Sequence, residues 1–249
     1  MDIKAYLERI NYDGPLDPGA ETLLRLHRAH MLSVPFENLD IHLERPIILD
    51  EGKLLSKVVG RRRGGFCYEL NGAFGALLRA LGFDVQMVSA GVAKEAGGFG
   101  PPFDHMALLV RLEDRWLADV GFGDSFREPL LLDRPGPQVQ KEGAYLIDRD
   151  GEHFILKQRD DSGSWEPQYR FTLEPFRYED FAEMCRYHQT SPDSPFTRRR
   201  TCSLATQGGR ITLTDMRLIT TTGEGRQERA LATQDEYAAA LREHFGVEL

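Results

Sequence analysis

Hydrophobic residues in the first part of the chain repeat at the three- and four-residue spacing of helices. Behind Asp2, a possible N-cap, this spacing predicts a first helix over residues 3–10. A second helix is predicted over residues 21–31, and Pro35 ends that segment.

A third helix has the clearest apolar stripe, between Leu70 and Leu81, and Gly82 is a plausible left-handed terminator. Gly64 and Gly65 precede it and permit a tight backbone entry. This arrangement predicts Cys67 at the N-terminus of the helix.

From Phe83 onward the hydrophobic period changes from helical spacing to two. Strands are predicted at 85–88, 106–112 and 116–120, and hairpins join 145–147 to 154–156 and 203–206 to 210–213. Helices are predicted over 178–187 and 235–245. Helices first, strands next and a mixed tail indicate an α+β protein with two or three subregions.

Composition and charge narrow the class of protein. With 41% hydrophobic and 28% charged residues, the chain is an ordinary globular one rather than disordered or fibrous. We expect no signal peptide and no membrane-spanning segment, hence a cytoplasmic protein. The net charge of −8 argues against a nucleic-acid or anionic-membrane partner. We interpret Arg61–Arg63 and Arg198–Arg200 as solvated faces, either of which could hold a phosphate locally.

The three cysteines Cys67, Cys185 and Cys202 form no C-x-x-C pair, so neither a disulfide framework nor a zinc site is expected. His27 and His30 lie three residues apart, without a second pair of ligands. We therefore predict free thiols and no metal.

Cys67 is the candidate nucleophile. The positive end of the helix dipole and unpaired N–H groups favour a thiolate there, so we expect its pKa to lie below that of a free thiol. The alternative is a small buried core residue.

A nucleophilic cysteine needs a base and an acceptor that orients the base. His105 begins one predicted strand, and Asp119 lies among apolar residues in the next one. With a turn at Glu113–Arg115, Asp119 faces Leu109, about 13 Å from His105 along the strand. A turn centred near Leu112, or a bulge, would bring the two side chains together.

Four stretches of the chain resemble the arylamine N-acetyltransferases. They are Pro35–Leu39, the R-G-G-x-C block of Arg63–Asn71, His105-Met106 and Asp119–Gly123. The tail at His188–Phe196 and Glu236-Tyr237 also resembles bacterial members of this family. The similarity spans essentially the whole chain in the expected order.

The resemblance implies a catalytic triad of Cys67, His105 and Asp119 in a papain-like core. It further implies an N-terminal helical bundle (1–83), a central antiparallel β-barrel (84–187) and a C-terminal α/β lid (188–249). The implied reaction is ping-pong. Acetyl-CoA, as co-substrate, acetylates Cys67, and an arylamine or arylhydrazine nitrogen then takes the acetyl group.

Weaker assignments follow from the same resemblance. Phe36, Val92 and Phe122 are expected to line the pocket of the aromatic acceptor. Phe103 and Asp104 are expected to contact CoA. Glu37 and Arg63 are expected to form a structural ion pair that braces the Cys67 loop.

Three other readings stay open from the sequence. An amide synthase of polyketide biosynthesis would use the same triad. A papain- or transglutaminase-like thiol hydrolase is a further alternative, distinguished by whether water or an amine resolves the acyl-enzyme. A binding module would rest on the two arginine clusters alone. The oligomeric state and the physiological acceptor are left open by the sequence.

Overall fold

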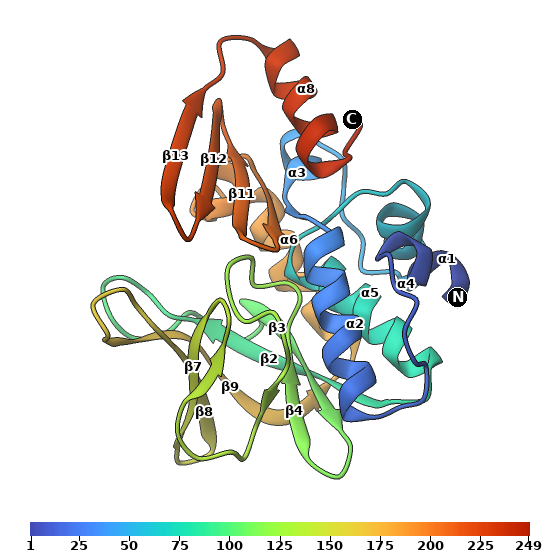
Figure 1. Cartoon of the computed structure of the whole chain (residues 1–249), viewed down its shortest axis with the longest axis vertical. Helices are drawn as coiled ribbons and strands as arrows, with labels where there is room; N and C mark the ends of the chain where they lie inside the picture. The colour runs from blue at the N-terminus through green and yellow to red at the C-terminus, as the bar shows by residue number, and fades with distance from the viewer.

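The computed structural model describes residues 1–249 and has an α+β fold (Figure 1). Helices α1 (Ile3–Arg9), α2 (Ala20–Ser33) and α5 (Cys67–Ala80) confirm the three predicted helices. Between them lie short elements that the periodicity did not reveal: β1 (Phe36–Glu37), α3 (Leu39–His42), α4 (Glu51–Leu55) and the π turn η1 (Ser56–Gly60).

An eight-stranded antiparallel sheet curls into a nearly closed barrel, with the strand order β5-β4-β3-β2-β9-β8-β7-β6. Its strands are β2 (Asp84–Val92), β3 (His105–Arg111), β4 (Arg115–Ala118), β5 (Leu130–Leu131), β6 (Gln138–Gln140), β7 (Gly143–Asp150), β8 (His153–Arg159) and β9 (Trp165–Phe176). The predicted strands at 85–88, 106–112 and 116–120 are confirmed with shifted ends, and so is the hairpin of β7 and β8.

Glutamine side chains join the two edge strands of this barrel. Gln138 on β6 accepts a hydrogen bond from the Leu131 amide at 2.9 Å and donates to the Leu131 carbonyl at 2.8 Å. Gln140 contacts the backbone of Arg127 and Glu128 in the same manner. These amides take the place of a strand ladder and satisfy backbone groups that an open edge would leave unpaired.

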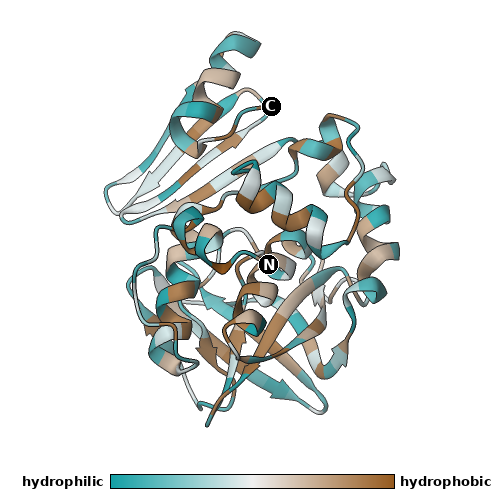
Figure 2. Ribbon diagram, turned by 90° about the vertical axis from the view of Figure 1, so that its right-hand side faces the viewer, coloured by the Kyte–Doolittle hydropathy of each residue, from teal (hydrophilic) through white to brown (hydrophobic).

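Strand β3 is buried on both faces, which explains its continuous hydrophobic sequence. Met106, Leu108 and Val110 pack with α5 in one core, whereas Ala107 and Leu109 lie inside the barrel. Alternating side chains therefore connect two cores through one strand. In Figure 2 the hydrophobic colour gathers along the strands and helices of this main body.

The pairing of β3 with β4 differs from the expected register. Arg111 pairs with Arg115 and Leu108 with Ala118, so the connection is residues 112–114 rather than Glu113–Arg115. The turn lies one residue earlier than expected, which shifts the register by two. Asp119 follows directly after Ala118, the last residue of β4. Because the two strands are antiparallel, β3 begins with His105 at this same end of the strand pair.

A second, five-stranded sheet has the order β1-β10-β11-β12-β13. It contains β10 (Thr201–Thr206), β11 (Gly209–Thr214), β12 (Arg217–Thr222) and β13 (Gly225–Ala230), and α8 (Gln234–Phe245) packs on it through a separate core. The hairpin of β10 and β11 and the final helix confirm the predictions. The division at residues 83 and 187 stays a prediction.

The helix expected over 178–187 is a 3-10 turn, η2 (Tyr178–Phe181), followed by α6 (Ala182–Thr190). A short helix, α7 (Pro195–Arg198), then leads into β10. No helix combines the length and the apolar character that crossing a membrane requires.

Candidate active site

Cys67 is the first residue of α5, as its two preceding glycines predicted. The Glu37 amide donates to the Gly65 carbonyl at 2.9 Å, so β1 runs beside the entry to the helix. A Cβ on Gly64 would lie 1.9 Å from the Pro35 carbonyl oxygen, which leaves room only for glycine there. The close backbone contact fixes the position of the Cys67 turn.

His105 and Asp119 are hydrogen-bonded, with 2.7 Å between Nε2 and Oδ2. Burial alone would raise the pKa of Asp119, but the His105 ring, Asn71 and the Gly121 amide outweigh it and hold the pKa below its usual value. The carboxyl is therefore ionised at neutral pH. Nε2 then carries the hydrogen of this bond, and Nδ1 is left to accept a proton.

Two residues to which the sequence analysis gave no role in the active site support Asp119. Asn71 donates to Asp119 Oδ1 at 2.8 Å and to the Met106 carbonyl at 2.6 Å, and it accepts from the Val120 amide. His27 accepts from the Asp119 amide at 3.1 Å while its Nδ1 contacts the Arg127 carbonyl. Burial lowers the pKa of His27 to about 4, so the ring stays neutral and can accept from that amide.

The helical spacing from Cys67 could have indicated that Asn71 belongs to the site, but no sequence spacing indicates His27. Asn71 lies four residues after Cys67 and hence on the same face of α5. His27 meets its two partners only through the tertiary fold.

A cavity of about 420 Å³ contains both Cys67 and His105 in its wall. The residues that line it are Phe36, Cys67, Val92, Ala93, Lys94, Asp104, His105, Gly121, Phe122, His188, Pro195 and Phe196. Phe122 contacts the His105 ring edge-on, with 5.2 Å between centroids. The wall is mainly apolar, which suits a planar aromatic ring beside the Cys67 thiol.

Gly121 brings the Asp119 loop onto the start of α5. A Cβ at this position would lie 2.7 Å from the Cys67 Cα and equally close to the Asn71 amide nitrogen. The absence of a side chain on Gly121 therefore sets the separation between the start of α5 and the loop that carries Asp119.

The expectation of a lowered Cys67 pKa is wrong for the thiol taken alone. Burial raises its pKa well above the usual value, and the backbone N–H groups of Met106 and Tyr68 only partly oppose this. A thiolate in this site therefore needs a proton acceptor beside it. His105 lines the same cavity and has Nδ1 free for that proton.

The weaker assignments separate into two groups. Phe36, Val92 and Phe122 line the cavity, and so does Asp104. Phe103 does not line it, because its ring packs on Phe176 and Phe181 at centroid distances of 4.8 and 5.2 Å. We therefore leave Phe103 out of the contacts proposed below.

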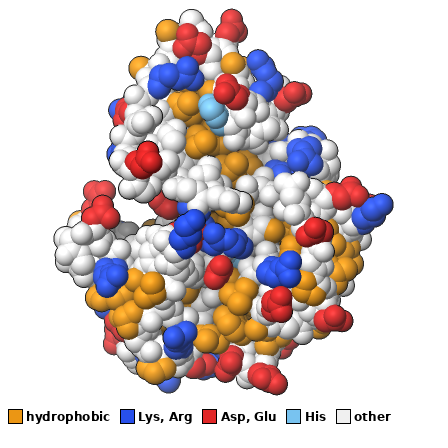
Figure 3. All heavy atoms as spheres, in the orientation of Figure 1, with side chains coloured by type: hydrophobic (Ala, Val, Ile, Leu, Met, Phe, Trp, Pro, Cys, Tyr) orange, Lys and Arg blue, Asp and Glu red, His pale blue; other side chains and the backbone are white.

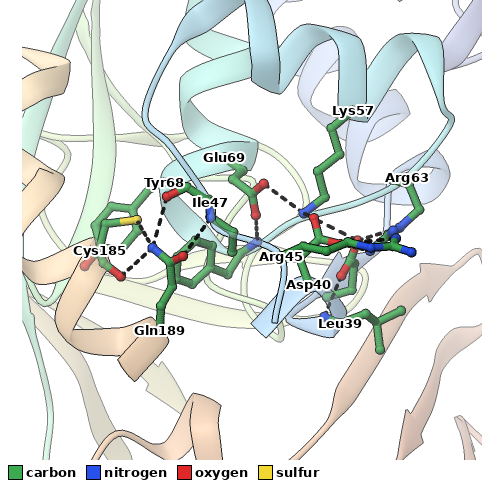
Figure 4. Close-up of polar contacts among 12 residues, drawn as sticks. Leu39, Asp40, Arg45, Ile47, Lys57, Arg63, Tyr68, Glu69, Cys185 and Gln189 are labelled. Atoms are coloured by element: carbon green, nitrogen blue, oxygen red, sulfur yellow. Dashed lines mark hydrogen bonds and ion pairs between the residues drawn. The ribbon is translucent and has the colours of Figure 1, made fainter. Parts of the chain in front are cut away.

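The expected ion pair of Glu37 and Arg63 is confirmed, with 2.7 Å between Oε1 and Nη2. It is part of a larger buried cluster, shown in Figure 4, in which Lys57 contacts Asp40 and Glu69 at 2.8 Å each. Burial raises the pKa of Glu69 to about 7 despite Lys57. Glu69 also accepts from the Phe66 amide at 3.2 Å, so the cluster holds the turn that carries Cys67.

Comparisons with known proteins show the family of this chain. A sequence model of the family described as N-acetyltransferase matches residues 20–249. The arylamine N-acetyltransferase of Escherichia coli is 34% identical over 246 residues, 97% of this chain and 87% of that protein. Proansamycin X synthase of Amycolatopsis mediterranei is 29% identical, over 97% of this chain and 95% of its own.

Solved structures match over the same extent. The arylamine N-acetyltransferase of Mycobacterium marinum in complex with CoA has a TM-score of 0.91 and 29% identity, over 99% of this chain and 93% of its own. The M. smegmatis enzyme has a TM-score of 0.93 and 33% identity, over 100% and 93%. By its sequence along nearly the whole length and by its fold, this chain belongs to the arylamine N-acetyltransferase family.

Proposed function

We propose that the protein transfers an acetyl group from acetyl-CoA to the nitrogen of an arylamine or arylhydrazine through acetyl-Cys67. The observation that carries this proposal is the common cavity of Cys67 and His105, with Asp119 hydrogen-bonded behind the imidazole. The catalytic roles are Cys67 as nucleophile, His105 as acid and base, and Asp119 as the residue that orients His105.

In the first half-reaction, Cys67 Sγ attacks the thioester carbonyl of acetyl-CoA while Nδ1 of His105 takes the thiol proton. The C–S bond to CoA then breaks, and His105 returns the proton to the departing CoA sulfur. Exchange of one thioester for another is nearly balanced, so this step needs no further driving force.

In the second half-reaction, the amine nitrogen attacks the carbonyl carbon of acetyl-Cys67. His105 takes the proton that the nitrogen loses and gives it to the departing Cys67 sulfur. A weakly basic aromatic amine is unprotonated at neutral pH, so its lone pair is available for attack. The free thiol is regenerated for the next cycle.

A neighbouring cavity of about 640 Å³ gives the donor a place for its phosphates. It shares Phe36, Pro195 and Phe196 with the catalytic cavity, and Arg198 and Arg199 lie in its wall. We propose that these arginines meet the CoA phosphates, because guanidinium groups bind phosphate strongly. We also place the protein in the cytoplasm, since its three free cysteines suit a reducing compartment.

The similarity to proansamycin X synthase supports an amide synthase as a second candidate. That activity needs room for a long acyl chain, whereas a cavity of about 420 Å³ suits an acetyl group and one aromatic ring. We therefore rank the acetyltransferase first.

Steady-state kinetics test the proposal. CoA release is measured against acetyl-CoA concentration at several fixed concentrations of an arylamine such as 4-methylaniline. Parallel double-reciprocal lines are expected for a ping-pong reaction. Intersecting lines would contradict the acetyl-enzyme route, and turnover of long acyl thioesters but not acetyl-CoA would favour the amide synthase.

A further inference from the structure

One carboxylate, that of Asp104, lines the wall of the cavity but forms no hydrogen bond with the His105 ring. Its Oδ2 accepts from the Val92 amide at 3.2 Å, and its Oδ1 lies 3.2 Å from His188 Nε2. Contacts at both oxygens hold the side chain against the wall. Its side chain remains 18% exposed, and each oxygen has a second lone pair for another hydrogen bond.

His188 comes from α6 and is itself held in place. Its Nδ1 lies 3.2 Å from the Ser194 hydroxyl, and its ring meets Phe196 edge-on with 5.1 Å between centroids. The side chain is only 4% exposed. His188 therefore lies against Asp104 and offers a bound molecule little surface of its own.

Apart from His188, no charged group that lines the cavity forms an ion pair with Asp104. Lys94 is the only lysine or arginine in the lining, and it lies exposed, where water and salt screen its charge. His105 is already bonded to Asp119. The surrounding aromatic and aliphatic side chains keep the local dielectric low, so a second anion close to Asp104 would be strongly disfavoured.

We propose that Asp104, held by Val92 and His188, determines which amines this protein accepts. It selects aromatic amines whose ring carries a hydrogen-bond donor, neutral or cationic, and disfavours those that carry a carboxylate. The inference rests on the proposed function, because the amine enters this cavity as the second substrate of the ping-pong reaction.

The test compares two acceptors of nearly the same shape, 4-aminobenzamide and 4-aminobenzoate. The enzyme is first acetylated with acetyl-CoA and freed of CoA. Loss of the acetyl group is then followed by intact mass in single turnovers with each amine below saturation. The ratio of the two second-order rate constants, amide over carboxylate, is the measured quantity.

In the wild type this ratio is expected to favour 4-aminobenzamide, and Asp104→Asn is expected to lower it by about tenfold or more. Asparagine keeps the size of the side chain and an oxygen for the Val92 amide, so the change isolates the charge. Asp161→Asn removes an exposed carboxylate outside the cavity and is expected to leave the ratio unchanged. Asp104→Ser serves if the asparagine variant does not fold.

An equal ratio in the wild type and in Asp104→Asn would overturn the inference while leaving acetyl transfer intact. A wild-type preference for 4-aminobenzoate would overturn it without any variant. If no acetyl-enzyme forms at all, the proposed function fails first and the inference falls with it.

Discussion

At the scale of single residues, burial and hydrogen bonds determine which of the side chains of Cys67, His105 and Asp119 holds a proton. Burial raises the pKa of the Cys67 thiol, and the contacts of Asp119 keep its carboxyl ionised. In the proposed mechanism His105 takes the thiol proton and returns it. The sequence predicted all three residues as the triad. It also predicted a lowered pKa for the Cys67 thiol, because neither a helix terminus nor a neighbouring His–Asp pair indicates how deeply the thiol is buried.

Replacing His105 with glutamine tests whether the imidazole accepts the proton of the Cys67 thiol. Because burial raises the pKa of the Cys67 thiol, the thiol should stay protonated at pH 7 when no imidazole can accept its proton. Alkylation of Cys67 by iodoacetamide at pH 7 is expected to fall by about 10²-fold or more, measured by peptide mass. His153→Gln, on β8, is the matched control, and equal rates in wild type and His105→Gln would contradict the account.

At the scale of elements, the sequence predicted those helices and strands whose buried faces give a clear hydrophobic pattern. Strand β3 was predicted because both of its faces are buried, whereas β13 was missed because all six of its residues are exposed and mostly polar. Strand β9 was also missed, since its charged residues and two prolines hide the alternation. The register of β4 depended on a turn placed one residue earlier, a difference that composition does not encode.

The cluster behind α5 makes a prediction about stability and pH. The pKa of Glu69 is raised by burial from 4.5 to about 7, so the folded protein binds this proton more tightly than the unfolded chain. Its contribution to the free energy of unfolding is full below about pH 4.5 and is lost as the pH rises to about 7. Glutamine at position 69 does not titrate. Between these pH values the free energy of unfolding of Glu69→Gln should therefore fall by less than that of the wild type, and the difference should be on the order of 3 kcal/mol.

Urea unfolding at several pH values measures this difference. Glu152→Gln, a change of an exposed glutamate, is the control and should follow the wild-type pH profile. A pH dependence in Glu69→Gln equal to that of the wild type would show that Glu69 does not titrate in this range.

At the scale of the whole molecule, buried polar side chains join parts that are distant in sequence. Arg127, which follows the barrel strand β4, donates to the Thr206 carbonyl and, at 2.5 Å, to the Gly209 carbonyl of the second sheet. Glu142 pairs with both Arg127 and Arg28 of α2. Figure 3 shows basic side chains gathered in the middle of the visible face, where the upper and lower parts meet. No local sequence pattern predicts the contacts of Arg127 and Glu142, because their partners are distant in sequence.

Arg127→Met tests how strongly this junction stabilises the protein. The change removes the hydrogen bonds to the part-buried Thr206 and Gly209 carbonyls and one of the two partners of Glu142. The free energy of unfolding, measured in urea, should therefore fall by about 2–4 kcal/mol. Arg115→Met breaks an exposed pair with Asp133 and should cost less than about 1 kcal/mol. Similar losses in the two variants would mean that the Arg127 contacts add little.

The central claim is that Cys67 carries the acetyl group, and intact mass tests it most directly. The purified protein is mixed with acetyl-CoA without any amine, beside a Cys67→Ala variant whose fold is checked by circular dichroism. The account predicts a gain of one acetyl group on the wild type alone, removed when an arylamine is added. An unmodified wild type, or an equal gain on Cys67→Ala, would contradict it.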